Sequence, residues 1–418
     1  MPDFSAEART LDAGDALAPF RDRFVIKDPE LIYLDGNSLG RLPKKTIEVM
    51  RELVEEQWGG ELVGGWKRWI DLPRRLGTKI AGLIGAQPDE VIVCDSTSVN
   101  LFKLTVGALH LIPDRGKIVT DDANFPSDVY ISVGAAVMTG KTAFDVVKVN
   151  ESLDAATANV ESALDGETAL LTLSHALFKS GYVHDMGRLT GAAHEVGALA
   201  LWDLSHSVGA LPIDLNGCDA DLAVGCCYKY LNGGPGAPAF LYVKKSLQSR
   251  LSSPIWGWFG TRNAFDFSLS YEPAPDVNRY LAGTPPILSM AAAEPGIDLI
   301  HEAGLAALRE KSVAQTDFLI RLIDTELAPF GFTVLTPRDS KVRGSHVAVA
   351  HPEAWRINQA LIAEMKVIPD FRAPDVLRLG VTPLSTTFAE LAQGVERIRT
   401  VMGELRYEKY SAERSVVT

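Results

Sequence analysis

A lysine stands between two tyrosines in the segment GCCYKYLNGGPG, which runs from Gly225 to Gly236. Small and apolar residues precede Lys229, and a glycine-rich loop follows it. Lysine is rarely buried without a reason. Burial lowers the pKa of an amine, and a neutral amine is a nucleophile that can form a Schiff base with an aldehyde. The alternative is a lysine that reaches solvent, and the segment alone does not separate the two.

Asp203 favours the chemical interpretation. It ends the apolar run LALWD, one strand–loop–strand unit before Lys229. A lysine Schiff base together with an acidic partner for a pyridinium nitrogen is what pyridoxal phosphate (PLP) requires. Taken alone, the same carboxylate is as typical of a turn or a helix cap.

Two further segments could complete a cofactor site. DSTSVN follows the apolar run VIVC and opens a helix pattern, so Thr97 and Ser98 lie where hydroxyl and backbone N–H groups can bind an anion. ANFPSD follows the next strand pattern and contributes Phe125, which could stack on a flat ring. A helix cap and a core aromatic are the ordinary alternatives. Four such signals at successive strand ends favour a PLP site.

The elements that must position these residues alternate between strand and helix. Helix patterns alternate with apolar, β-branched runs. This alternation predicts an α/β fold, with a mostly parallel sheet and helices on both faces. In such folds ligands bind at the carboxyl ends of the strands. The helix patterns cover 73–85, 97–110 and 186–198, and the strand patterns cover 89–96, 117–122, 144–149, 168–176, 199–207 and 239–245.

The pattern changes after about residue 288. One long helix is expected over 289–327, followed by short strands and two more helices, which together predict a smaller α+β domain. We therefore expect an N-terminal helical and loop segment over 1–60 that packs with this small domain, a large PLP-binding α/β domain over 61–288, and the small domain over 289–418.

Composition excludes several classes of protein. The 418 residues carry a net charge of −12, which argues against a nucleic-acid partner. The four cysteines include no CxxC pair, so no metal site is expected, and their low number fits a reducing cytoplasm. The N-terminus has no signal-peptide pattern, and no apolar run approaches the roughly 18 residues of a membrane span. No GxGxxG follows a strand pattern.

Together these residues resemble aminotransferase-like (fold type I) PLP enzymes, and within them the kynureninase family. The resemblance extends from about residue 30 to about 400. The segments that carry it are IYLDGNSLG (32–40), FPSD (125–128), WDLSHSVGALPIDL (202–215), CYKYLNGGPG (227–236), GWFG (257–260) and the proline pair after Thr284.

The resemblance implies a catalytic set of Lys229, Tyr228 and Asp203. Lys229 carries PLP as a Schiff base, and Asp203 pairs with the ring nitrogen. The remaining cofactor contacts that it implies are His206 beside the ring hydroxyl, Phe125 stacked on the ring, Thr97, Ser98, Tyr228 and Trp256 around the phosphate, and Asp128, Ser174 and Thr284 completing the pocket.

The resemblance also implies how the substrate is bound. Arg378, in VLRLGVTPLS, would hold the α-carboxylate, because an arginine fork suits a carboxylate. Trp66 and Asn37 would be further substrate contacts. Trp256 and Thr284 would come from the second subunit of a homodimer with active sites at the subunit interface.

The implied activity is hydrolysis of the Cβ–Cγ bond of L-kynurenine to anthranilate and L-alanine, in tryptophan catabolism or NAD biosynthesis. The alternative enzyme is similar to a cysteine desulfurase acting on another β-substituted amino acid, and the segment SHALFKSG (174–181) favours it. That family needs a catalytic cysteine late in the chain, whereas the last cysteine here is Cys227. A non-catalytic PLP-binding protein is a third possibility, but no helix–turn–helix domain is appended.

The substrate pocket generates a first prediction. By the same resemblance, Thr284 stands where some relatives carry asparagine, and Trp66 and Trp69 replace more polar aromatics. The surroundings of the substrate ring are then less polar and less suited to a ring hydroxyl, so we expect a higher kcat/KM for L-kynurenine than for 3-hydroxykynurenine. Parallel steady-state assays with both substrates measure this, and the reverse order would contradict it.

Overall fold

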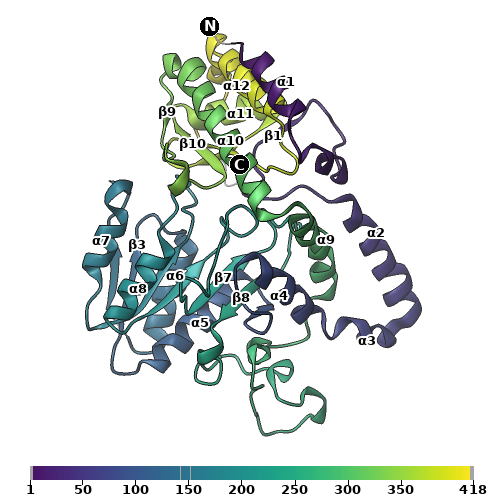
Figure 1. Ribbon diagram of the computed structural model, residues 1–418, viewed down its shortest axis with the longest axis vertical. Coiled ribbons are helices and arrows are strands. Elements are labelled where there is room, and N and C mark those ends of the chain that lie inside the picture. Colours follow the sequence, from purple (N-terminus) through teal and green to yellow (C-terminus); the bar gives the residue numbers. More distant parts are fainter. Residues whose placement is uncertain (1–2, 142, 151, 415–418) are drawn as a thin grey trace.

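The computed structural model describes residues 3–141, 143–150 and 152–414. A large part built on a seven-stranded sheet lies below a smaller part built on a four-stranded sheet (Figure 1). The strands of the large sheet, in spatial order, are β2 (Val91–Val93), β8 (Ala239–Val243), β7 (Leu222–Cys226), β6 (Leu199–Asp203), β5 (Thr168–Ser174), β3 (Lys117–Asp121) and β4 (Phe144–Val147).

The strands from β7 to β4 pair in parallel, whereas β8 runs antiparallel to both of its neighbours. The predicted mostly parallel sheet is therefore confirmed. Every residue of β5, β7 and β8 is buried, which explains why these runs are continuously apolar rather than alternating.

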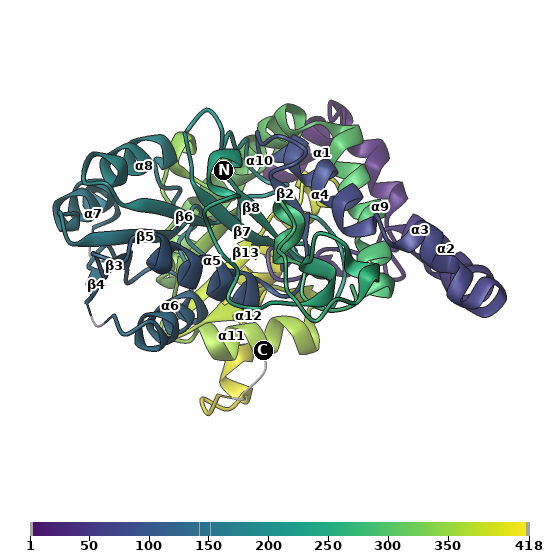
Figure 2. The same ribbon diagram turned by 90° about the horizontal axis from the view of Figure 1, so that it is seen from below.

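Helices cover both faces of this sheet (Figure 2). One hydrophobic cluster joins α5 (Thr97–Leu111) and α6 (Pro126–Met138) to one face through residues such as Leu104 and Ala136. The other face packs against α4 (Leu72–Leu83), α7 (Ala156–Ala163) and α8 (Met186–Glu195). Because the first turns of α5 and α6 follow β2 and β3, their N-termini lie at the edge where these two strands end.

The smaller sheet is antiparallel and has its own core. The chain's first helix, α1 (Phe4–Ala13), packs on its last long helix, and β1 (Ile32–Tyr33) pairs with β11 (Val367–Ile368). The other elements here are β12 (Asp370–Arg372), β13 (Val376–Gly380), β10 (His346–Ala350), β9 (Thr333–Val334), α11 (Ala354–Glu364) and α12 (Phe388–Gly403).

The segment after β1 has a different environment. Helix α2 (Lys44–Glu52) packs against α9 (Ile287–Ala303) rather than against the small sheet. Together with α3 (Trp66–Trp69) it projects from the side of the molecule (Figure 2). Residues 1–2 and 415–418 of the expected terminal parts lie outside the described residues. In the part of the chain that the structure describes, no helix combines the length and apolarity needed to span a bilayer.

The expectation of one helix over 289–327 is wrong. The chain forms α9, then α10 (Leu305–Leu322), and Gly304 between them has φ +79°. Only glycine takes this conformation readily, so the helix ends there despite helical patterning on both sides.

Gly304 allows a test of backbone strain alone, because an added Cβ would meet nothing within 4 Å. We expect Gly304→Ala to lower the free energy of unfolding by about 1 kcal/mol. Gly403, in the last turn of α12, is a matched control with equally open space and no positive φ. Gly403→Ala should stabilise the protein by about 0.5 kcal/mol. Denaturant unfolding measures both, and equal effects of the two substitutions would contradict the assignment.

Candidate active site

The predicted lysine lies where three parallel strands end. Ser174 and Asp203 are register partners at the last residues of β5 and β6, and Lys229 follows the end of β7 by three residues. The Lys229 Nζ is 2.9 Å from His206 Nε2, and 5.9 Å from the centre of the Phe125 ring. The fold therefore brings together side chains that lie up to about a hundred residues apart in the sequence.

His206 is held neutral in this environment. It is buried, and burial lowers the pKa of its imidazole well below the usual value, with the nearby Lys229 charge acting in the same direction. A neutral imidazole has one acceptor nitrogen, which can accept from the Lys229 ammonium. The His206 Nδ1 is buried and has no hydrogen-bond partner among the described residues.

Two carboxyl groups face each other beside the lysine. The Ser205 backbone N–H and hydroxyl both donate to Asp203 Oδ1, at 2.8 and 2.6 Å, which leaves Oδ2 for another partner. Burial, and then the adjacent Asp203 charge, raise the pKa of Asp128 well above its usual value, while Lys229 opposes the rise. Asp128 is therefore the protonated member of the pair. Sequence reasoning missed Ser205, although its place two residues after Asp203 is typical of an Asx turn.

The predicted phosphate turn opens α5. Ser96 caps the helix by accepting from the Val99 N–H at 3.3 Å, and Thr97 and Ser98 are the first two helical residues. The first N–H groups of a helix have no partner within the helix and attract anions. The Ser98 hydroxyl lies 3.2 Å from that of Ser127, which joins the two predicted segments and had not been singled out.

Ser174 has a partner that the sequence did not indicate. Its hydroxyl donates to Asn124 Oδ1 at 2.6 Å, and the Asn124 amide donates to Thr120 Oγ1 at 3.0 Å. Asn124 Oδ1 also accepts from the Phe125 N–H at 2.8 Å. Ser174 thus fixes the turn that presents Phe125.

The N-terminal motif packs directly against the lysine segment. The Gly40 N–H donates to Tyr228 O at 2.8 Å, and a Cβ on Gly40 would lie 2.3 Å from Lys229 O. Only glycine permits this approach. On the other side a Cβ on Gly380 would meet Asn37 Oδ1 at 1.9 Å. Asn37 is fully buried, and neither amide atom has a hydrogen-bond partner in the described part of the chain.

Arg378 is more restrained than the sequence predicted. It is 1% exposed, and its Nε and Nη2 both bond to Asp370 Oδ2. Nη2 also donates to Ser38 Oγ at 3.0 Å, and Nη1 donates to Phe178 O at 2.5 Å. Both Nη2 hydrogens are thus engaged, so a substrate carboxylate at Arg378 would have to replace Ser38 or accept from the second Nη1 hydrogen. The same Asp370 Oδ2 lies 3.1 Å from Arg372, a second arginine that sequence reasoning did not include.

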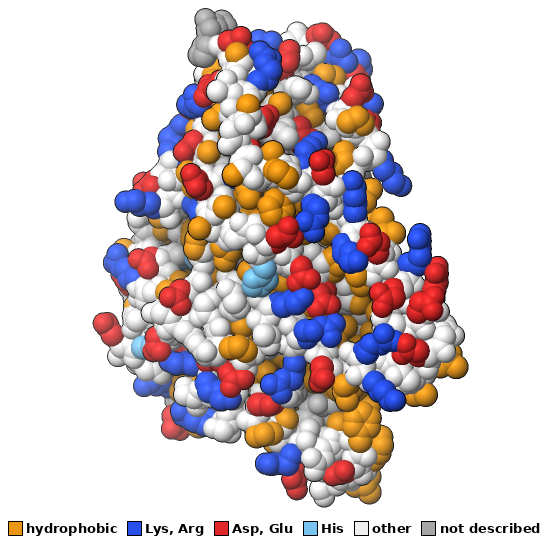
Figure 3. Space-filling view, turned by 45° about the vertical axis from the view of Figure 1, so that its right-hand side comes forward, with side chains coloured by type: hydrophobic (Ala, Val, Ile, Leu, Met, Phe, Trp, Pro, Cys, Tyr) orange, Lys and Arg blue, Asp and Glu red, His pale blue; other side chains and the backbone are white. Residues whose placement is uncertain are grey.

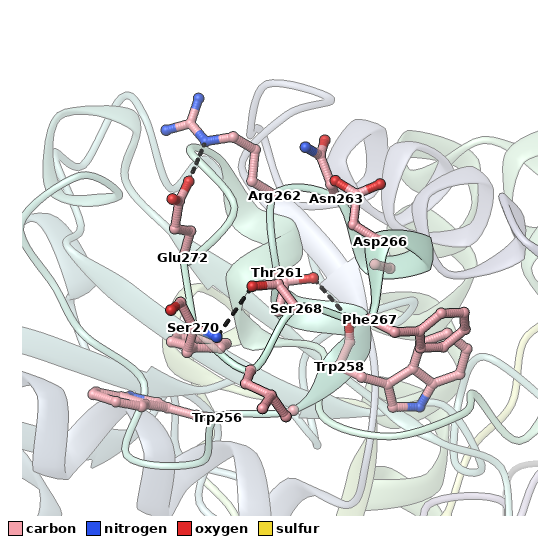
Figure 4. A pocket seen from close by; sticks show the side chains of 14 residues that line it. Trp256, Trp258, Thr261, Arg262, Asn263, Asp266, Phe267, Ser268, Ser270 and Glu272 are labelled. Atoms are coloured by element: carbon pink, nitrogen blue, oxygen red, sulfur yellow. Dashed lines mark hydrogen bonds and ion pairs between the residues drawn. The ribbon is translucent and has the colours of Figure 1, made fainter.

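Trp256, Thr284 and Trp66 make their contacts elsewhere. Trp256 is 69% exposed and stacks on Tyr271 with ring centres 4.8 Å apart. It borders a cavity of about 350 Å³ within the loop 256–272 (Figure 4). Thr284 is exposed, and Trp66 packs edge-on against Trp69 and beside Phe259. The structure of one chain does not connect these three residues with Lys229.

The residues near Lys229 fit the predicted cofactor. A Schiff-base lysine, a carboxylate with a free oxygen at Asp203 and a helix N-terminus at Thr97 are the three groups that PLP needs. The buried His206 Nδ1 and Asp128 Oδ2 have no hydrogen-bond partner among the described residues, which is uncommon for buried polar atoms and fits a site that binds a polar group.

Comparison with solved structures defines the class of protein. The cystine C–S lyase C-DES, in a complex with its reaction product cysteine persulfide, covers 89% of this chain and 98% of its own at a TM-score of 0.77 and 19% identity. The apo cysteine desulfurase from Thermococcus onnurineus NA1 covers 90% and 94% at a TM-score of 0.73 and 20% identity. The chain therefore has the aminotransferase-like fold of type I PLP enzymes, as predicted.

Sequence relatives identify the family. The kynureninase of Pseudomonas fluorescens is 44% identical over 411 residues, which cover 96% of this chain and 95% of that protein. The kynureninase of Burkholderia mallei (strain SAVP1) is 42% identical over 402 residues, covering 95% of each. The family model of the kynureninase C-terminal domain matches residues 308–398. The chain belongs to the kynureninase family, and the predicted resemblance is confirmed.

The unequal carboxyl pair generates a prediction. Because Asp128 is protonated, Asp128→Asn should change the dissociation constant for PLP by less than about threefold. Asp203→Asn removes the charge that a protonated ring nitrogen requires and should raise this constant at least about tenfold. Titration of apoprotein, followed by cofactor absorbance, measures both. Equal losses in the two variants would contradict the assignment of the proton to Asp128.

Proposed function

We propose that this protein is a PLP-dependent hydrolase that cleaves the Cβ–Cγ bond of L-kynurenine to anthranilate and L-alanine in tryptophan catabolism. The observation that carries the proposal is the group of Lys229, His206, Phe125 and Asp203 at one sheet edge, in a chain 44% identical to a kynureninase over 96% of its length. When bound, PLP supplies an electron sink for the bonds at the substrate's α-carbon.

Lys229 has two tasks in this proposal. It tethers the cofactor, and once released it moves the proton at the substrate's Cα, with its amine held near His206 Nε2. Because His206 is neutral, it accepts a hydrogen bond from the Lys229 amine and does not repel the charged form of that amine. The amine therefore keeps its position when it gains or loses a proton.

Tyr228 is the proposed acid for the step at the γ-carbonyl. Its ring is half-buried, and burial raises the pKa of the phenol, so the hydroxyl keeps its proton at neutral pH. The Lys229 Nζ lies 5.8 Å from the centre of the Tyr228 ring. A protonated phenol at this position can donate to the oxygen that develops charge as water adds.

The alternative, a desulfurase-like activity, has less support. Such a reaction needs a thiolate that can reach the substrate. Cys227 is fully buried, and burial raises the pKa of its thiol. The likeness to cysteine desulfurases, at 20% identity or less in the structures compared, concerns the fold alone.

We also propose a homodimer with active sites at the subunit interface. Trp256 and Thr284, which the family resemblance assigns to the neighbouring subunit's site, lie on an exposed surface. Apolar side chains gather at the lower tip of the molecule (Figure 3), on the loop coloured teal-green in Figure 1. A second copy of the chain would bury this surface, whose members are Trp256, Trp258, Phe265, Phe267 and Leu269.

The remaining proposals concern organisation and location. We retain the three-part division at residues 60 and 288, supported by the separate core of the smaller sheet, although α9 contributes Met290 and Ile297 to the core of the large part. A cytoplasmic location is supported by four free cysteines, three of them buried.

The central test combines substrate turnover with a lysine variant. PLP-loaded protein mixed with L-kynurenine should release anthranilate and L-alanine in equal amounts, measured by fluorescence and amino-acid analysis. Lys229→Ala should lose the visible cofactor absorbance and nearly all turnover. Lys148 is an exposed lysine that directly follows the edge strand β4, and Lys148→Ala is the control, which should keep the cofactor absorbance and the turnover. A cofactor band with no anthranilate would overturn the proposed substrate, and normal turnover in Lys229→Ala would overturn the proposed mechanism.

A further inference from the structure

A second lysine in this molecule is more deeply buried than Lys229. Lys103, in the second turn of α5, has a side chain that is 0% exposed. Its ammonium pairs with Asp95 Oδ2 and donates to Tyr280 O at 2.6 Å. A buried ammonium is costly unless its hydrogen bonds are satisfied. An apolar residue of similar volume at position 103 would fill this space without the desolvation cost. The reason for a lysine here therefore lies in its two acceptors, Asp95 and Tyr280.

The first acceptor belongs to the turn that leads into the predicted phosphate site. Asp95 has φ +46°, a left-handed conformation that aspartate and asparagine adopt more readily than most residues other than glycine. It directly precedes Ser96, the cap of α5, and stands two residues before Thr97. The Asp95 backbone carbonyl also accepts from the Ala239 N–H at 2.8 Å. The bond from Lys103 therefore fixes the side chain of the residue that joins β2 to the first turn of α5.

The charge of Asp95 gives the pair a second consequence. A carboxylate at Asp95, two residues before the predicted phosphate contact Thr97, would repel a bound phosphate, because both groups are anions. The Lys103 ammonium neutralises this carboxylate from the buried side, while the Asp95 side chain stays 30% exposed. Hence the helix N-terminus can present its N–H groups to an anion without an opposing charge close by.

The second acceptor belongs to the segment that leads to Thr284. Tyr280 is fully buried, and its hydroxyl donates to Leu251 O at 3.1 Å. Two residues later, Ala282 O would lie 1.9 Å from a Cβ on Gly257, the neighbour of Trp256. Lys103 thus connects the phosphate turn of its own subunit with the surface that carries Trp256 and Thr284.

We propose that Lys103 is a positioning residue for the cofactor phosphate. It neutralises Asp95 and fixes the turn at Thr97 and Ser98, so that the phosphate meets hydroxyl and N–H donors rather than a free carboxylate. The proposal rests on the proposed PLP site, and deepens it. Lys103 touches neither the substrate nor the reacting atoms, so its effect should appear in recognition of the phosphate and not in recognition of the ring.

The test compares PLP with pyridoxal, which has the same ring and aldehyde but no phosphate. Apoprotein is titrated with each compound, and the ratio of the two dissociation constants measures phosphate recognition separately from fold and turnover. Lys103→Met should lower the preference for PLP at least about tenfold and leave the pyridoxal constant within about twofold. Asp95→Asn keeps a residue that tolerates positive φ, and it should restore part of the preference in the Lys103→Met background.

Lys311 offers a matched control. It is also buried, pairs with Asp15 at 2.6 Å and donates to Pro383 O at 2.5 Å, far along the chain in α10. Lys311→Met should lower the unfolding temperature as Lys103→Met does, yet leave the PLP-to-pyridoxal ratio unchanged. If Lys103→Met does not fold, Lys103→Gln is measured, and it should reduce the ratio.

The outcomes separate the two proposals. Wild-type protein that binds PLP no better than pyridoxal would overturn the proposed phosphate site. Wild-type protein that prefers PLP, with the same preference in Lys103→Met and Lys103→Gln, would overturn the role of Lys103 alone. An equal loss of affinity for both compounds would also overturn it, because the lysine would then support only the fold.

Discussion

The site depends on the parallel pairing of β5, β6 and β7. Parallel strands end at the same edge of a sheet, so one set of backbone hydrogen bonds places Ser174 opposite Asp203 and brings Lys229 beside them. Every residue of β5 and β7 is also buried, so the turns that follow them start from the interior of the large part. Desolvation and hydrogen bonding at His206 and Asp128 follow from that burial, since both groups lie on the short turns and helices attached to this edge.

Burial at this edge leaves few groups charged. His206 and Asp128 are held neutral, and the Ser205 N–H and hydroxyl both donate to Asp203 Oδ1. The other end of the site behaves differently. There Asp370 is shared by Arg378 and Arg372, and burial together with the Asp370 charge raises the pKa of Asp35 to about 7. The lysine end therefore carries mostly neutral groups, whereas the arginine end carries two guanidinium groups around one shared carboxylate.

The sequence was sufficient to predict those features of the fold that depend on local residue patterns. Strand and helix periodicity predicted the α/β sheet, and the position of Thr97 after an apolar strand predicted a helix N-terminus. Contacts between distant segments were not visible, because nothing near Ser174 indicates Asn124 and nothing near Arg378 shows that its fork bonds to Asp370 twice. The break at Gly304 was missed for a related reason, since a glycine within a helical pattern can remain helical and its φ depends on how the two helices pack.

The contacts of the N-terminal motif tie the two ends of the chain together. Gly40 bonds to Tyr228, the Gly380 N–H donates to Leu34 O at 2.6 Å, and Ile32 pairs with Val367. During synthesis the first forty residues leave the ribosome long before residue 380, so the contacts of Ile32 and Leu34 with the C-terminal part form only when the chain is nearly complete. The N-terminal motif is thus fully anchored only late in synthesis, and a chain that ends before residue 367 holds Lys229 beside a motif that lacks its C-terminal contacts.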